Sequence, residues 1–170
     1  GFGESLVHRA GGIGQVGDLK NYFEFERSYF DPTLWRNGEP VHTRGYCSDV
    51  YTEAAMEFIE AHREAPFFVY LSFNAPHTPL QVPEEFMEGY KDKDPAEVSY
   101  PKRGRPLPQM SEREKDAARR VYGMVSNIDR NLGRLFNQLR SLSLDSNTVV
   151  IFLTDNGPQQ HRYTAGLRGL

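Results

Sequence analysis

Two short, nearly continuous apolar runs constrain the fold more than any other feature of the sequence. The first spans residues 66–73 and the second spans residues 148–154. Apolar runs of this length are typical of strands covered on both faces, as in a parallel sheet. A helical pattern precedes each run. The order therefore predicts an α/β fold with a mostly parallel central sheet flanked by helices.

The sequence predicts two long helices before these runs. Apolar residues at helical spacing indicate a first helix that is capped by Ser48 or Asp49 and ends near Arg63. The second begins after Ser111, and Glu114 three residues later completes a capping-box pattern. Its apolar stripe is expected to face the core and consists of Val121, Met124, Val125, Ile128, Leu132, Leu135 and Leu139.

Turn signals divide the rest of the chain. Asn37-Gly38 predicts a surface hairpin between residues 29–36 and 39–43. Pro83 and the acidic pair after it predict a short helix that reaches Tyr90. The proline-rich, charged residues 91–109 are expected to form a surface loop, and residues 145–147 a turn.

Charge and composition exclude several classes of protein. The formal net charge of −3 offers no general attraction to nucleic acid or anionic membranes. No apolar run approaches the about 20 residues that a membrane-spanning helix needs. The single cysteine, Cys47, excludes a disulfide framework within the chain and a cysteine-rich zinc site. We interpret Cys47 as a structural residue and not as a nucleophile.

Polar residues follow both apolar runs. Asp155 and Asn156 place a carboxylate and an amide oxygen side by side, and Gly157 permits a sharp turn. Hard divalent cations prefer such oxygen ligands. Asp-Asn-Gly is also an ordinary turn sequence, so the tripeptide fits either a metal site or a simple strand ending.

His77 follows the first run and lies between two prolines, Pro76 and Pro79. Its imidazole is suited to donate a hydrogen bond to an anionic oxygen or to act as a general acid. An ordinary loop histidine fits the same position. We call the residues that follow the two runs the polar tips: His77 is in one, and Asp155 and Asn156 are in the other. Ligands of parallel α/β sheets bind beyond the carboxyl ends of the strands, so we expect both polar tips to line one pocket.

Taken together, three segments resemble the sulfatase family of the alkaline-phosphatase superfamily. Residues 66–79 resemble the segment that ends in Ala-Pro-His-x-Pro, and residues 122–130 with Gly133-Arg134 resemble the family's long helix. Residues 147–157 resemble the strand that carries two metal ligands, and Asn37-Gly38 with residues 45–49 resembles the connecting segment. The resemblance implies an alkaline-phosphatase-like sandwich and the hydrolysis of sulfate esters.

The resemblance also implies roles for particular residues. Asp155 and Asn156 would bind the divalent cation, usually Ca²⁺ with Mg²⁺ as the alternative. His77 would hydrogen-bond the sulfate group and help to protonate the leaving oxygen. His8 precedes a glycine-rich loop and His161 follows the metal strand, so both are candidates for substrate binding. The expected substrate is a small-molecule or carbohydrate sulfate ester.

Other family elements lie outside the sequence. Sulfatases use a formylglycine made from a C/S-x-P-x-R motif, which is absent here, and the family lysine would follow directly after Leu170. The resemblance therefore implies that residues 1–170 are part of a single catalytic domain, truncated at both ends and inactive alone. The parent protein is expected to be periplasmic or secreted.

Two alternatives to a sulfatase remain open at this point. The first is a phosphodiesterase or phosphonate hydrolase of the same superfamily, which an upstream Thr or Ser nucleophile would indicate. The second is a non-catalytic paralogue that only binds a sulfated ligand. The Ala-Pro-His-x-Pro context favours a sulfatase, and the paired metal ligands argue against a catalytically inactive protein.

Overall fold

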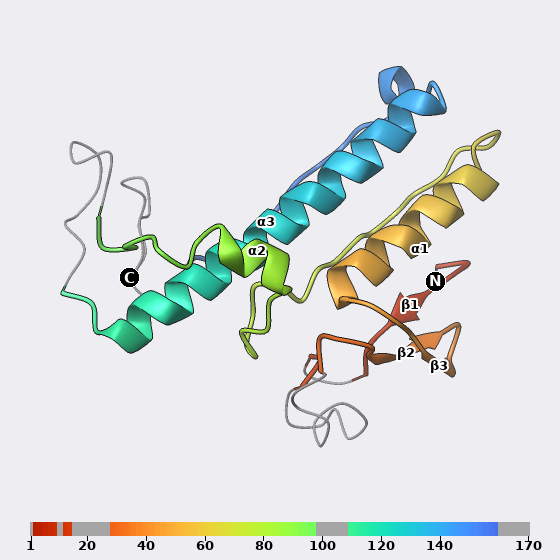
Figure 1. The fold of residues 1–170 in the computed structure, drawn as a ribbon. Coiled ribbons are helices and arrows are strands. Elements are labelled where there is room, and N and C mark those ends of the chain that lie inside the picture. Colours follow the sequence, from red (N-terminus) through yellow and green to blue (C-terminus); the bar gives the residue numbers. More distant parts are fainter. Residues whose placement is uncertain (1, 10–11, 15–27, 98–108, 160–170) are drawn as a thin grey trace. The chain divides into compact units, whose positions relative to one another are not determined.

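The structure is a computed structural model that describes residues 2–9, 12–14, 28–97 and 109–159 (Figure 1). The chain divides into two compact units. The first comprises Gly1–Gln81 and Val125–Thr148, and the second comprises Val82–Met124 and Val149–Leu170. The longest helix runs from the second unit into the first.

The first unit contains a three-stranded antiparallel sheet in the order β1-β2-β3. Its strands are β1 (Leu6–Val7), β2 (Thr33–Arg36) and β3 (Glu39–His42). The predicted hairpin is confirmed, with Asn37 at φ 52° and Gly38 at φ 92° in the two-residue turn. Such a turn requires positive φ at both positions, which Asn-Gly adopts with little strain. The two residues of β1 are too few to give a recognisable sequence pattern.

The sequence predicts a hairpin on the surface, but part of the observed hairpin is buried. Leu34 and Trp35 of β2 are buried, whereas β3 is mostly exposed. Strand β1 pairs with the other edge of β2, so β2 is the middle strand of the sheet. That pairing joins residues about 30 positions apart, and turn chemistry carries no information about such a partner.

Helix α1 (Cys47–Ala61) begins two or three residues earlier than predicted. Its N-cap residue is Tyr46, and no side chain caps the helix there. The predicted caps are wrong because both residues lie inside the helix. Ser48 is fully buried, and the carboxylate of Asp49 binds residues of another helix.

Helix α3 (Glu112–Ser141) begins as predicted. The Ser111 amide donates to Glu114 Oε2 at 2.8 Å, and the Glu114 amide donates to Ser111 Oγ at 3.3 Å. These reciprocal bonds form a capping box, which satisfies two amides that the first turn leaves without helical partners. The sequence therefore located this helix start correctly.

The predicted apolar stripe of α3 is only partly the buried face. Val125 is 47% exposed, whereas the two asparagines Asn127 and Asn131 are 0% exposed. Asp49 Oδ1 of α1 accepts hydrogen bonds from both amides, at 2.9 Å from Asn127 and 2.6 Å from Asn131. Arg130 adds an ion pair at 3.7 Å to the same carboxylate. A polar contact therefore replaces part of the expected apolar seam.

Removal of the Asp49 carboxylate should destabilise the protein strongly. In Asp49→Ala both buried asparagine amides lose their charged acceptor, so we expect the free energy of unfolding to fall by about 2–3 kcal/mol. Glu53→Ala is the matched control, because Glu53 pairs with Arg134 at 3.0 Å but is well exposed. That exposed pair should contribute less than about 1 kcal/mol. Urea denaturation of the full-length protein measures both, and equal losses would contradict the expectation.

The two apolar runs are not buried in the structure. Phe68 is 72% exposed and Val149 is 88% exposed, and neither run pairs with any strand among the described residues. The prediction of doubly covered strands is wrong for the described part of the chain. Burial on both faces requires neighbouring strands and helices, and the described sheet is antiparallel and built from other residues.

In the second unit, helix α2 (Glu84–Glu88) confirms the predicted short helix, with Pro83 as its N-cap residue. It packs on the first part of α3. A Cβ atom added to Gly123 would lie 2.8 Å from Val82 Cγ2 and 3.2 Å from the Phe86 carbonyl oxygen. Glycine permits this close approach. Residues 91–97 and 109 of the predicted loop are described, and the predicted turn at 145–147 is a single 3-10 turn.

Candidate functional site

The turn that carries His77 is held from both ends, while its imidazole is exposed. Ala75 and Pro79 are buried, and the His77 amide donates to the Asn74 carbonyl oxygen at 2.9 Å. His77 Nδ1 lies 2.8 Å from the Thr78 carbonyl oxygen. A carbonyl oxygen only accepts, so this hydrogen bond requires a proton on Nδ1 and leaves Nε2 for an external partner.

His8 lies beside the same turn, although 66 residues separate it from Asn74 in the sequence. Asn74 Nδ2 lies 3.0 Å from His8 Nε2, directly after strand β1. The structure therefore brings two of the predicted site residues, His8 and His77, to one turn. His8 Nδ1 lies 3.4 Å from the Arg9 carbonyl oxygen, so both ring nitrogens already have a partner within the chain.

Arg9, the residue after His8, adds a positive charge beside it. The guanidinium carbon of Arg9 lies 4.8 Å from the centre of the Trp35 ring, within range of a cation–π contact. The contact holds the Arg9 guanidinium near strand β2, and a guanidinium is well suited to bind an oxyanion. Trp35 is a residue of β2 that lies 26 positions from Arg9, so the spacing of the two residues in the sequence does not indicate their contact.

Side chains from residues 28, 29 and 46 contact the segment from His77 to Gln81: Tyr29 bonds to His77, and Ser28 and Tyr46 bond to Gln81. The hydroxyl of Tyr29 donates to the His77 carbonyl oxygen at 3.0 Å. Gln81 Oε1 accepts from Ser28 Oγ and from the Tyr29 amide, each at 2.9 Å. The Tyr46 hydroxyl donates to the Gln81 carbonyl oxygen at 2.9 Å. Sequence reasoning missed this set, because nothing local marks contacts between residues 35 to 53 positions apart.

Asp155 and Asn156 form an exposed turn stabilised by local hydrogen bonds. The Asn156 amide donates to Asp155 Oδ1 at 2.9 Å, and Asn156 Nδ2 donates to the Gly157 carbonyl oxygen at 2.9 Å. These bonds match an ordinary turn. They also leave Asp155 Oδ2 and Asn156 Oδ1 without a donor among the described residues, and both are hard oxygen ligands.

The two oxygens suit a hard cation in chemistry but are too few to enclose one. Ca²⁺ takes about 6–8 oxygen ligands. In the described ranges no group of three or more His, Cys, Asp or Glu residues is arranged to hold a metal ion. His77 belongs to the first unit, and Asp155 and Asn156 belong to the second. That the two polar tips line one pocket therefore stays a prediction. The fourth candidate residue, His161, lies outside the described residues.

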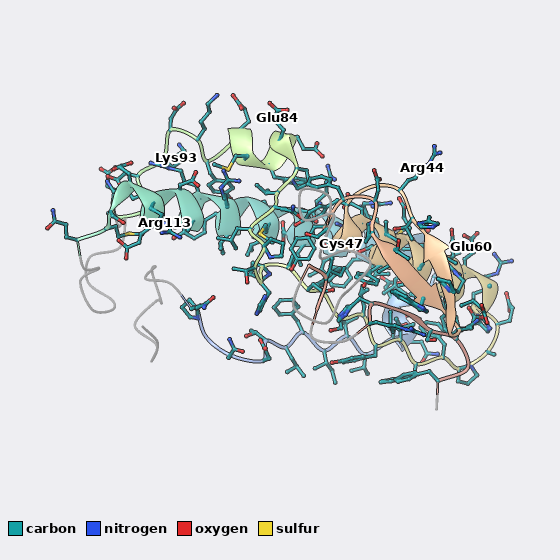
Figure 2. The ribbon with its side chains drawn as sticks, turned by 90° about the horizontal axis from the view of Figure 1, so that it is seen from below. Arg44, Cys47, Glu60, Glu84, Lys93 and Arg113 are labelled. Atoms are coloured by element: carbon teal, nitrogen blue, oxygen red, sulfur yellow. The ribbon has the colours of Figure 1, made fainter. Side chains whose placement is uncertain are left out.

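Cys47 has the properties of a structural cysteine. Its side chain is 0% exposed at the start of α1, where Figure 2 labels it, and burial raises the pKa of the thiol to about 12. A thiol with such a pKa is almost entirely protonated at neutral pH and is a poor nucleophile. The charged side chain of Arg44, three residues earlier, is exposed.

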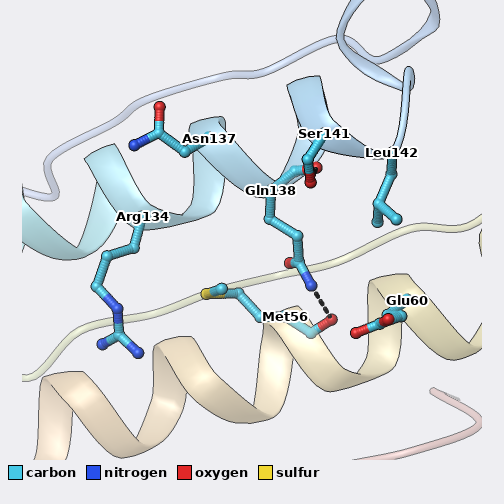
Figure 3. Close-up of a pocket in the computed structure, with 7 residues that line it drawn as sticks. All are labelled: Met56, Glu60, Arg134, Asn137, Gln138, Ser141 and Leu142. Carbon is cyan, nitrogen blue, oxygen red and sulfur yellow. Dashed lines mark hydrogen bonds between the residues drawn. The ribbon is translucent and has the colours of Figure 1, made fainter.

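A hollow of about 550 Å³ lies between α1 and the second half of α3 (Figure 3). Gln138 Nε2 donates to the Met56 carbonyl oxygen across it at 3.1 Å. The remaining lining residues are Glu60, Arg134, Asn137, Ser141 and Leu142. None of the predicted site residues lines this hollow, so it is not the candidate site.

No described helix is long and apolar enough to cross a membrane.

Comparison with known proteins identifies the family. The sulfatase family model matches residues 5–169. The chain is 30% identical to an arylsulfatase of Klebsiella aerogenes, a match that covers 92% of this chain and 40% of the relative. It is 28% identical to an endo-4-O-sulfatase of Bacteroides thetaiotaomicron, covering 81% of this chain and 26% of the relative. The chain belongs to the sulfatase family.

A solved structure supports the same assignment. The crystal structure of Ps i-CgsB in complex with k-i-k-neocarrahexaose matches with a TM-score of 0.58 and 25% identity, over 85% of this chain and 30% of that one. The likeness places the chain in the α/β fold of sulfatases, which is of alkaline-phosphatase type. The chain spans less than half the length of the relatives named here.

Proposed function

We propose that the full-length protein hydrolyses sulfate esters. The observation that carries the proposal is the family match over residues 5–169, which includes both polar tips. Within that match, His77 presents an exposed Nε2, and Asp155 and Asn156 keep one oxygen each for an external partner. These are the groups needed to bind and polarise an anionic ester.

Asp155 and Asn156 are proposed as ligands of Ca²⁺, with Mg²⁺ as the alternative. A bound divalent cation supplies positive charge that stabilises oxyanions, and a formylglycine elsewhere in the protein would supply the nucleophile. The Asn156 amide nitrogen is taken by the Gly157 carbonyl oxygen, so the amide oxygen is the atom that remains for the cation. The local turn would thereby orient both ligand oxygens before binding.

His77 is proposed to act on the sulfate group and the leaving oxygen. The Thr78 carbonyl oxygen holds Nδ1, so Nε2 is the nitrogen that reaches the substrate. In the imidazolium form Nε2 donates a hydrogen bond to a sulfate oxygen. The same proton can pass to the ester oxygen as its bond to sulfur breaks, which is general acid catalysis.

The substrate is proposed to be a sulfated carbohydrate. Two relatives are an endo-4-O-sulfatase and an N-acetylgalactosamine-6-O-sulfatase of Bacteroides thetaiotaomicron, and one solved relative is in complex with k-i-k-neocarrahexaose. His8 and His161 are proposed as substrate-binding residues. The guanidinium of Arg9 beside His8 adds positive charge suited to a polyanionic sugar.

The test compares sulfate and phosphate esters with one preparation of the full-length protein. Sulfate release from sulfated oligosaccharides is measured by ion chromatography, and phosphodiester hydrolysis is measured with a chromogenic diester. We expect sulfate release that a chelator lowers at least about 10-fold and Ca²⁺ restores. Faster hydrolysis of the phosphodiester would identify the related phosphodiesterase activity instead. Tight binding of sulfated sugars without turnover would identify a non-catalytic relative.

A further inference from the structure

Tyr29 is fixed at three atoms, two of them in its main chain. Its amide donates to Gln81 Oε1 at 2.9 Å, and its carbonyl oxygen accepts from the Cys47 amide at 2.8 Å at the start of α1. Its ring is buried and packs edge-on against Tyr46, with ring centres 6.0 Å apart. The side chain therefore has little freedom to move.

The third fixed atom is the hydroxyl, which reaches the main chain of His77. Tyr29 Oη donates to the His77 carbonyl oxygen at 3.0 Å. Burial raises the pKa of the Tyr29 hydroxyl well above its usual value, so the group keeps its proton and stays a donor. The bond joins the start of α1, through Tyr29, to the residue whose imidazole is exposed.

Gly14 closes the same arrangement from a third side. Gly14 has φ +70°, and a Cβ atom there would lie 2.8 Å from Ser28 Oγ and 3.2 Å from Pro79 Cδ. Only a residue without a side chain fits between Ser28 and the end of the His77 turn. The turn is thus packed against segments that are distant in sequence.

We propose that Tyr29 is a positioning residue that sets where the imidazole of His77 lies. The inference rests on the proposed role of His77 in sulfate ester hydrolysis. Tyr29 does not touch the substrate, and its hydroxyl acts through the His77 main chain. A displacement of this carbonyl moves Nε2, and small errors of position lower the rate of an oriented reaction steeply.

The chain offers a closely matched control. Tyr46 is also buried, and its hydroxyl also donates to one main-chain carbonyl oxygen, that of Gln81, at 2.9 Å. Tyr29→Phe and Tyr46→Phe therefore each remove one buried hydroxyl hydrogen bond, and their losses of stability should be similar. Only Tyr29→Phe releases the His77 carbonyl oxygen.

The kinetic test uses the full-length protein and four variants: Tyr29→Phe, Tyr46→Phe, His77→Ala and the double variant of Tyr29 and His77. We expect Tyr29→Phe to lower kcat about 10-fold with KM changed less than about 3-fold, and Tyr46→Phe to change kcat less than about 2-fold. In the His77→Ala background Tyr29→Phe should cause no further loss. Equal effects of the two tyrosines, or an undiminished effect without His77, would overturn the inference.

A second readout separates this inference from the proposed function. Selective ¹⁵N-histidine labelling shows the imidazole signals, and His77→Ala identifies those of His77. Tyr29→Phe should shift the His77 signals and Tyr46→Phe should leave them unchanged, whatever reaction the protein catalyses. Unshifted His77 signals in Tyr29→Phe would refute the positioning role. Shifted signals in a protein without sulfatase activity would refute only the proposed function.

Discussion

Asp155→Asn should lower kcat/KM for sulfate ester hydrolysis by the full-length protein about 100- to 1000-fold. The substitution keeps an oxygen that accepts from the Asn156 amide, a bond of 2.9 Å in the structure. The turn is therefore retained, while the negative charge of a proposed cation ligand is lost. Initial rates of sulfate release and Ca²⁺ titration by calorimetry measure the two consequences, and both should be impaired.

This substitution separates the two interpretations of the Asp-Asn-Gly tripeptide. If Asp155 only forms a turn, asparagine should replace it with little effect, because the local hydrogen bond survives. Asp145→Asn is the matched control, since Asp145 is an exposed acidic residue at the other end of the same extended segment. A change of less than about 3-fold in Asp155→Asn would contradict the proposed metal site.

His77→Ala should lower kcat at least about 100-fold, because it removes the donor that reaches the substrate through Nε2. The size of the effect should depend on the leaving group. A general acid matters less for an acidic phenol, which leaves without a proton, than for a sugar alcohol. Comparison of aryl sulfates with sulfated sugars therefore distinguishes protonation of the leaving oxygen from hydrogen bonding to sulfate.

His62→Ala is the control for this second prediction. His62 is also exposed, and its Nδ1 also lies 2.8 Å from a main-chain carbonyl oxygen, that of Phe58. The two histidines thus resemble each other in exposure and local bonding, but only His77 lies in the Ala-Pro-His-x-Pro turn. Equal and small effects of the two substitutions would show that His77 is an ordinary loop histidine.

The parts of the fold that the sequence predicted well are those with partners close in the chain. The capping box joins Ser111 to Glu114, and the hairpin turn is made by Asn37 and Gly38 themselves. Each pattern contains its own stabilising contact. Both partners of each contact are therefore visible in a short stretch of sequence, and long-range packing has little influence on whether the cap or the turn forms.

The parts that the sequence missed depend on distant partners. Asp49 was taken for a helix cap, but its carboxylate binds Asn127, 78 residues away. The same contact explains why the buried face of α3 carries asparagines where an apolar stripe was expected. A buried amide is stable only beside its acceptor, and helical spacing does not reveal which acceptor that is.

The candidate site shows the same division. His77, Asp155 and Asn156 were selectable because each follows an apolar run and matches a family motif. The contacts around His77 could not be predicted from the sequence, because their partners are far apart in the chain. Tyr29 lies 48 residues from His77, and Asn74 lies 66 residues from His8. Motifs thus identify the groups that carry chemistry, whereas the residues that position those groups emerge only from the three-dimensional arrangement.

The most direct test of the account is a crystal structure of the full-length protein with Ca²⁺ and sulfate bound. Asp155 and Asn156 should each place an oxygen about 2.3–2.6 Å from the cation. Nε2 of His77 should lie about 3 Å from an oxygen of the sulfate that the same cation contacts. A cation bound elsewhere, or a His77 ring directed away from the sulfate, would contradict the proposal that the two polar tips form one site.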